Sequence, residues 1–247
     1  FIHNDLHSDN IMFKKTDIEF RYYRYKDVYF KIPTYTVLGF KDIFGNFTNQ
    51  NAKYTKSNHY VTGLDYALGN ASRISIEGFI KQYENFPISI VDGVSLANKG
   101  ADFEVLGNEN IITNGTGKTK GIEFLFQQKL TRNFYGIFSY TFFKSEFTDI
   151  NGNYLPSVWD SKHLSSFSGG YKLKRNWEIS SRWRFAGKTP YVPYDLDSSL
   201  LNYPNMILDY SQLGNVKLNN FSQLDIRLDK KWNREKISVN FFIEILN

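Results

Sequence analysis

Hydrophobic and polar residues alternate with a period of two along much of the chain. The clearest examples are residues 176–187, 223–232 and 237–246, where most alternate positions are apolar. In the second segment the intervening positions are all polar: Gln223, Asp225, Arg227, Asp229 and Lys231. Because a β-strand turns successive side chains to opposite faces, each segment predicts a strand with one apolar and one polar face.

Weaker alternation upstream raises the expectation to at least eight strands after residue 58. Several of these reach at least ten residues, whereas strands of ordinary soluble sheets average about 5–6. Polar turns are expected at 69–72, 131–133, 174–176 and 233–236, and long polar connections at 89–119, 148–162 and 191–220. Short and long connections alternate, so the sequence predicts an all-β antiparallel meander of long hairpins with its loops gathered at one end.

Two architectures fit such a meander. In a soluble up-and-down barrel the apolar face points inward, and such a protein would act as a soluble binding module. In an outer-membrane barrel the apolar face meets lipid and the polar face lines a hydrated lumen. The strand lengths match the ~9–11 residues of a bilayer-spanning strand. Aromatic residues near strand ends would suit interfacial girdles: Tyr135, Tyr171, Trp177 and Trp232. The pattern favours part of a transmembrane outer-membrane β-barrel.

Composition narrows the class further. The 247 residues are 41% hydrophobic and 22% charged, which excludes a disordered chain. No stretch approaches the ~18 apolar residues of a membrane-spanning helix. Cysteine is absent, which excludes disulfides, thiolate metal sites and cysteine nucleophiles. The formal net charge is +5, yet acidic residues share the polar strand faces with basic ones. A strand face that carries charges of both signs suits a hydrated lumen better than a surface that binds the phosphates of a nucleic acid. No nucleic-acid partner is therefore expected.

At this point the residues resemble a known family. The segments that carry the resemblance include NGTGKTKGIEFLFQQKL (114–130), SSFSGGYKL (165–173), WEISSRWRFAGKTPY (177–191) and NNFSQLDIRLDKKW (219–232). From about residue 53 to 247 the chain resembles the C-terminal part of the β-barrel of TonB-dependent outer-membrane receptors. Each motif is weak alone, but together they follow the order and spacing of the family.

The resemblance implies a barrel of about 22 strands that is closed by an N-terminal plug. It implies uptake of a scarce nutrient of the siderophore, cobalamin or glycan class, powered by an inner-membrane TonB complex. It places the protein in the outer membrane of a Gram-negative-type bacterium, in contact with lipid, with no enzymatic activity, cofactor or metal. The chain holds eight to ten expected strands and no plug, so a receptor fragment is expected. Ligand contacts would come from lumen side chains and from loops 89–119 and 191–220, and no individual ligand-binding residue is predicted.

The start of the chain resembles a different family of proteins. The segment FIHNDLHSDNIMF (1–13) resembles the H-x-D-x-x-x-x-N catalytic loop of aminoglycoside-phosphotransferase and protein-kinase-like enzymes. That resemblance implies Asp5 as the proton acceptor and Asn10 as a Mg²⁺ ligand. The segment Asp42–Gly45 has one residue more than the D-F-G motif, and no phosphate-covering glycine-rich loop is present.

The hypothesis that follows divides the chain at residue 45. Residues 1–45 would be an unrelated segment and not an independent domain, and residues 46–247 a partial receptor barrel. A phosphotransferase remnant fused to a barrel fragment is the alternative function, and a chance match of a short motif is the other explanation. His3 and His7 flank Asp5, but two histidines without a third ligand do not predict a metal site.

Overall fold

The computed structural model describes residues 11–15, 18–30, 38–99 and 108–247, the first two ranges as backbone only. It is an antiparallel sheet with short helical turns in its connections. The strands are β1 (Ile11–Lys15), β2 (Ile18–Phe30), β3 (Thr55–Leu68), β4 (Ser72–Ser89), β5 (Ile111–Thr131), β6 (Phe134–Thr148), β7 (Tyr154–Pro156), β8 (His163–Lys172), β9 (Trp177–Ala186), β10 (Phe221–Asn233) and β11 (Ser238–Ile245).

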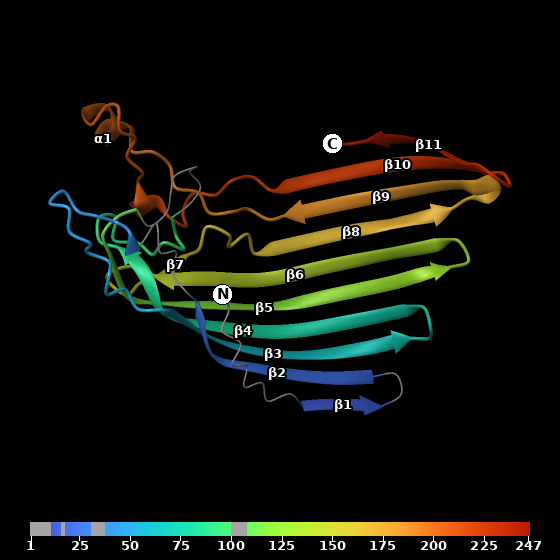
Figure 1. Ribbon diagram of the computed structural model, residues 1–247, viewed down its shortest axis with the longest axis horizontal. Helices are drawn as coiled ribbons and strands as arrows, with labels where there is room; N and C mark the ends of the chain where they lie inside the picture. The colour runs from blue at the N-terminus through green and yellow to red at the C-terminus, as the bar shows by residue number, and fades with distance from the viewer. Residues whose placement is uncertain (1–10, 16–17, 31–37, 100–107) are drawn as a thin grey trace.

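The sheet is a meander, as the sequence predicts. Its order is β1-β2-β3-β4-β5-β6-β8-β9-β10-β11, and β7 pairs with the loop end of β6. The tight turns lie together at one end of the strands and the long connections at the other (Figure 1). The helix α1 (Leu196–Leu201) lies in the connection between β9 and β10 at the loop end. No helix of the described residues is long and apolar enough to cross a membrane.

One predicted loop is shorter than expected. The connection expected at 89–119 ends at Ile111, because β4 and β5 stay paired as far as Ser89 and Ile111. The glycines in this stretch predict a turn, but here they allow close packing. A Cβ at Gly115 would lie 2.6 Å from the Phe86 carbonyl oxygen, and one at Gly117 would lie 2.3 Å from the Phe147 ring. Glycine therefore extends the strand where a larger side chain would clash.

The two faces of the sheet differ in how well neighbouring groups cover them. On β10 the side chains of Leu224 and Ile226 are 43% and 41% exposed, whereas Asp225 between them is 3% exposed. The same alternation of exposed apolar and covered polar residues runs along the second half of β3 and along β9 from Trp177 to Ser180. We call these the apolar face and the polar face. A soluble up-and-down barrel buries its apolar face, so this burial pattern argues against that alternative.

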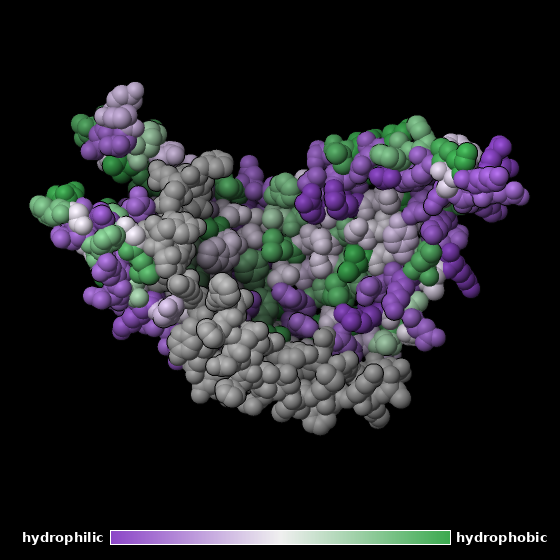
Figure 2. All heavy atoms as spheres, viewed as in Figure 1, coloured by the Kyte–Doolittle hydropathy of each residue, from purple (hydrophilic) through white to green (hydrophobic). Residues whose placement is uncertain are grey.

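The polar face is the inner side of a curved sheet. Figure 2 shows the molecule hollowed between its upper and lower edges, with hydrophilic residues gathered at the turn end. Inside the described residues, β1 pairs only with β2 and β11 only with β10, so each outer strand has one neighbour. Open edges of this kind are incompatible with hydrocarbon, which requires every backbone group to be paired. The sheet therefore has the form of a barrel segment.

The largest buried side chain lies on the polar face at the loop end. Phe147 is 1% exposed, and its ring centroid lies 4.5 Å from that of Phe86 and 5.8 Å from that of Trp159. The indole Nε1 of Trp159 donates to Ser145 Oγ over 3.1 Å. The loop 149–162 is thereby fixed against β6, and the barrel segment is packed most tightly under its loops.

The division expected at residue 45 stays a prediction. The strands β1 and β2 precede it, and β2 pairs with β3 from Ile18↔Tyr66 to Phe30↔Thr55, with one irregularity in register. The backbone upstream of residue 45 thus belongs to the same sheet as the rest of the chain.

Candidate ligand-binding lumen

An ion pair joins β9 and β10 at the middle of the polar face. The strand register sets Arg182 opposite Asp225, and the Nε and Nη2 of Arg182 both donate to Asp225 Oδ2, over 3.0 and 2.8 Å. Gln223 Nε2 donates to the other carboxylate oxygen over 3.0 Å, and Arg184 Nη2 donates to Gln223 Oε1 over 3.0 Å. The buried carboxylate is therefore fully hydrogen-bonded, as a covered charge must be.

A second ion pair follows nearer the turn end. Arg227 donates from Nε and Nη2 to the two oxygens of Asp229, each over 2.8 Å. The guanidinium carbon of Arg227 lies 3.9 Å from the Phe242 ring centroid. Arg227 Nη1 also lies 4.0 Å from Oε2 of Glu244 on β11. Asn240 Nδ2 also donates to Asp229 over 3.1 Å. The charges of both signs that the sequence predicts on one face do meet there, and they form a fixed ladder across three strands.

Tyr135 belongs to this ladder and not to a girdle. The sequence predicts it as an interfacial aromatic residue, but its hydroxyl donates to Glu178 on the polar face. Its ring lies across Gly170 of β8, where a Cβ would come within 2.6 Å of the hydroxyl oxygen. The prediction was wrong because position 135 is odd in a strand whose apolar face carries the even positions. The polar partner, Glu178 of β9, follows only from the registers of β6 with β8 and of β8 with β9.

The other three expected girdle residues do lie at the turn end of the apolar face. Tyr171, Trp177 and Trp232 are 44%, 37% and 48% exposed. The ammonium of Lys230 lies 5.2 Å from the Trp177 ring centroid and 5.6 Å from that of Trp232. A lysine between tryptophans suits the boundary between hydrocarbon and head groups, because the stem is apolar and the tip is charged.

The ladder leaves two shallow hollows on the polar face. One measures about 320 Å³ and is lined by the charged residues Glu178, Arg227, Asp229 and Lys231 together with Tyr135, Asn176, Ser180 and Asn240. The other measures about 230 Å³ and lies beside Arg182 and Asp225. Both present donors and acceptors to whatever occupies the lumen. They can bind a polar ligand or a polar protein segment, and their mixed charge does not select for one sign.

A charged cluster joins the loops above the sheet. Lys99 Nζ lies 2.5 Å from Glu109 Oε1 and also pairs with Asp92, and the Ser89 hydroxyl lies within hydrogen-bond distance of both carboxylates. The Lys99 side chain is 13% exposed. Asn49 donates to the Glu109 carbonyl over 2.7 Å, which ties loop 38–54 to the same cluster. Sequence reasoning missed this cluster because its members follow no regular spacing.

The connection from β9 to β10 projects from the loop end of the sheet and carries α1 (Figure 1). Asp195 caps α1, because its carboxylate accepts from the backbone N–H of Ser198 over 3.0 Å and from the Ser198 hydroxyl over 2.6 Å. The hydroxyl first, and then the backbone N–H, hold the pKa of Asp195 below its ordinary value. The same connection exposes a set of large apolar residues: Leu196, Leu200, Leu201, Tyr203 and Met206.

The candidates for catalysis and metal binding that the sequence offers lie near the start of the chain. Asp5, Asn10, His3 and His7 lie outside the described residues. In the described part of the chain, no group of three or more His, Cys, Asp or Glu side chains is placed to hold a metal ion.

The curved antiparallel sheet, the exposed apolar face and the charged inner face define a segment of an outer-membrane β-barrel. The family model for the TonB-dependent receptor-like β-barrel matches residues 21–247, and the chain belongs to this family. The match begins upstream of the division expected at residue 45. Members of this family are outer-membrane transporters and receptors, not enzymes.

Solved structures of the family share the fold. The pyoverdine receptor FpvA of Pseudomonas aeruginosa, bound to pyoverdine, matches with a TM-score of 0.62 and 15% identity over 92% of this chain and 29% of that chain. The ferric-catecholate import receptor Fiu of E. coli matches with a TM-score of 0.61 and 13% identity over 95% and 29%. The FrpB iron transporter of Neisseria meningitidis matches with a TM-score of 0.59 and 14% identity over 95% and 32%.

The chain therefore spans between a quarter and a third of the length of these receptors. At this level of identity the likeness concerns the fold. No curated protein matches the chain in a sequence comparison.

Proposed function

We propose that the chain is part of an outer-membrane receptor that imports a scarce nutrient through its lumen. The observation that carries the proposal is the ladder of ion pairs on the inner face, with the long loops gathered at one end of it. A lumen lined by fixed charges of both signs stays hydrated, and it offers polar contacts to a solute without trapping it.

The nutrient class proposed first is an iron chelate of the siderophore type. The support is that similar structures are titled as receptors for pyoverdine and ferric catecholate, and as an iron transporter. Cobalamin and glycans are the other classes for this barrel. Ligand contacts would come from loop 191–220 and from the polar face beneath it, where donors and acceptors remain open to the lumen.

The partners proposed are the outer-membrane lipid, a plug domain and the TonB complex. The charged ladder of β9 to β11 gives the plug a polar surface, because an internal domain that moves during transport needs contacts that water can replace. The apolar face supplies the contact with lipid.

The test is uptake by the bacterium that carries the gene. Disruption of the gene should abolish uptake of one nutrient from a panel of labelled ferric siderophores, cobalamin and oligosaccharides, under limitation for that nutrient. The intact gene should restore uptake. Unchanged uptake of every nutrient in the panel would overturn the proposal.

A variant links the uptake to the lumen. Replacement of Arg182 and Asp225 together by alanine removes the ion pair without changing the net charge and without leaving a lone buried carboxylate. We expect this variant to reach the membrane and to transport more slowly. The matched control is Lys236→Gln in the turn before β11, which should transport as the wild type does.

A further inference from the structure

A groove crosses the apolar face of four neighbouring strands about midway along their length. Its volume is about 630 Å³, and β3, β4, β5 and β6 contribute to its walls. Gly78 forms its floor, because a Cβ there would meet only Thr62, at 3.9 Å. The groove lies outside the barrel lumen, so the transported nutrient does not account for it.

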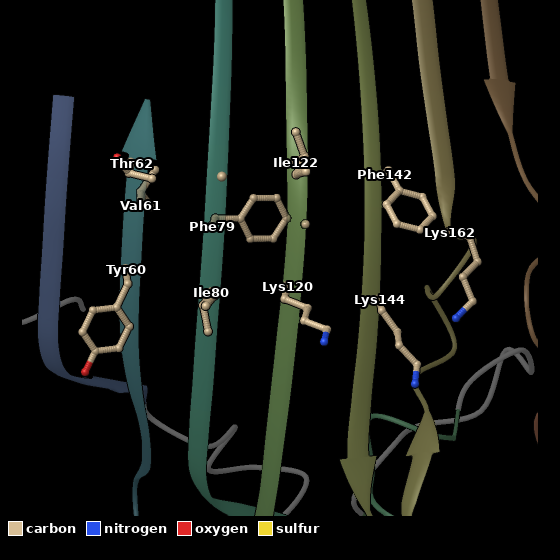
Figure 3. Close-up of a pocket in the computed structure, with 12 residues that line it drawn as sticks. Tyr60, Val61, Thr62, Phe79, Ile80, Lys120, Ile122, Phe142, Lys144 and Lys162 are labelled. Carbon is tan, nitrogen blue, oxygen red and sulfur yellow. The ribbon is translucent and has the colours of Figure 1, made fainter. Parts of the chain in front are cut away.

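The walls of the groove toward the turn end are apolar. Ile122 and Phe142 line them, with side chains that are 57% and 46% exposed, and Ile80, which is 48% exposed, lies opposite Lys120 in the strand register. Tyr60 closes one side, and Figure 3 shows these residues on adjacent strands around the open floor. An exposed apolar hollow on the lipid side of a barrel accommodates hydrocarbon.

Three lysines line the loop-ward end of the same groove. They are Lys120 of β5, Lys144 of β6 and Lys162 just before β8. Figure 3 shows their ammonium groups turned toward the loop end, with Ile122 and Phe142 on the turn side of Lys120 and Lys144 and with Tyr60 and Ile80 level with Lys120. From Lys120 toward the turn end, the apolar face of β5 continues with Ile122 and Phe124. The lysines therefore mark the outer boundary of the hydrocarbon region.

The lysines carry more positive charge than the surrounding carboxylates balance. Lys120 and Lys144 lie directly opposite each other in the strand register, an arrangement of like charges that destabilises a sheet. Glu146 pairs with Lys144 over 2.6 Å, and Asp160 pairs with Lys162 over 3.1 Å. Lys120 has no ion-pair partner within the part of the chain that the structure describes. An anion above Lys120 would offset the repulsion.

We propose that this groove is a binding site for a phosphorylated, acylated lipid of the outer leaflet. Its phosphate lies against Lys120, Lys144 and Lys162, and an acyl chain runs past Ile122 and Phe142 into the hollow above Gly78. The assignment uses the placement of the loops outside the cell, which belongs to the proposed function, but it does not depend on the nutrient that is transported.

The test measures lipid binding by the purified receptor that contains this chain. Native mass spectrometry in mild detergent compares bisphosphorylated lipid A, its dephosphorylated analogue and inorganic phosphate. Wild-type receptor should bind the phosphorylated lipid in preference to both others. The double variant Lys120→Gln, Lys144→Gln should bind it about 30-fold more weakly, on the basis of the attraction that each lysine provides near an anionic surface.

Controls separate a lipid site from general charge and from misfolding. Lys236→Gln removes one charge at the opposite end of the barrel and should bind as the wild type does. Gly78→Ala adds a Cβ in ordinary contact with Thr62 and should weaken binding, and Gly78→Val should weaken it more. Heat-modifiable migration on gels checks that each variant is folded.

Wild-type affinity in the lysine and Gly78 variants would overturn the proposal. Equal binding of the dephosphorylated analogue would overturn the role of the phosphate. Equal binding of inorganic phosphate would overturn the claim that the ligand is a lipid. If the lysine variant does not fold, the graded effect of Gly78→Ala and Gly78→Val decides. If the groove does not bind the lipid, the proposal of nutrient uptake through the lumen still stands, so the two proposals can be overturned independently.

Discussion

Single residues show how strongly the two faces of one strand differ. Phe147 and Phe142 both belong to β6, but Phe147 is 1% exposed on the polar face and Phe142 is 46% exposed on the apolar face. The buried ring packs against Phe86 and Trp159, and the exposed one faces lipid. The same residue type therefore has two energetic roles five positions apart.

The first prediction compares these two phenylalanines. Phe147→Ala should lower the free energy of unfolding of the receptor by about 3–5 kcal/mol, because it leaves a cavity that the packed loops cannot fill. Phe142→Ala should cost less than half as much, because lipid or detergent occupies the space. Urea titration of the purified receptor measures both, and equal losses would contradict the assignment of the faces.

A glycine on the polar face gives a second prediction. Gly170→Ala brings a Cβ within 2.6 Å of the Tyr135 hydroxyl and should cost about 1–3 kcal/mol by overpacking. In a Tyr135→Ala background the same change should be nearly neutral, because the ring that it strikes is gone. A double-mutant cycle on unfolding free energy measures the coupling. A coupling near zero would contradict the position of Tyr135 over Gly170.

Elements show why the strands were predictable and the loop contacts were not. The period of two predicts β9, β10 and β11 closely, because their apolar face must be continuous wherever it meets lipid. The loop-end extension of β5 was missed because Gly115 and Gly117 are the residues a turn uses. The Lys99 cluster and the partner of Tyr135 depend on register and on loop conformation, and neither leaves a periodic signal in the sequence.

The helix α1 carries a prediction at this scale. It has six residues, and Asp195 satisfies donors at its start. Asp195→Ala should therefore speed amide exchange at residues 198–202, measured by hydrogen–deuterium exchange, whereas Asp197→Ala should have a smaller effect. Unchanged exchange in Asp195→Ala would contradict the capping role.

The cap also depends on pH with a definite sign. Hydrogen bonds from Ser198 lower the pKa of Asp195 in the folded loop relative to the ordinary value of 3.8. The stabilisation is therefore fully present above that value, and it is lost as the pH falls through the lowered pKa. Wild-type exchange at residues 198–202 should approach that of Asp195→Ala only in strong acid.

At the scale of the whole molecule, one sheet separates three environments. Its apolar face meets lipid, its polar face meets the lumen, and its two ends carry the short turns and the long loops. The sequence predicts this arrangement because the strands after residue 58 repeat the same alternation. The strands upstream of residue 45 join the sheet through backbone pairing, which side-chain patterns do not report. The kinase-like motif at Asp5 and Asn10 stays a prediction.

The most direct test of the central claim labels the two ends of the barrel in living cells. The chain has no cysteine, so a single introduced cysteine is the only thiol of this chain that can react. Leu201→Cys lies in the loop that carries α1 and replaces a side chain that is 87% exposed. Asn70→Cys lies in the exposed turn between β3 and β4. A membrane-impermeant maleimide should label Leu201→Cys in intact cells, and Asn70→Cys only after the outer membrane is opened. Labelling of Asn70→Cys in intact cells, or protection of Leu201→Cys there, would contradict an outer-membrane barrel with its loops outside.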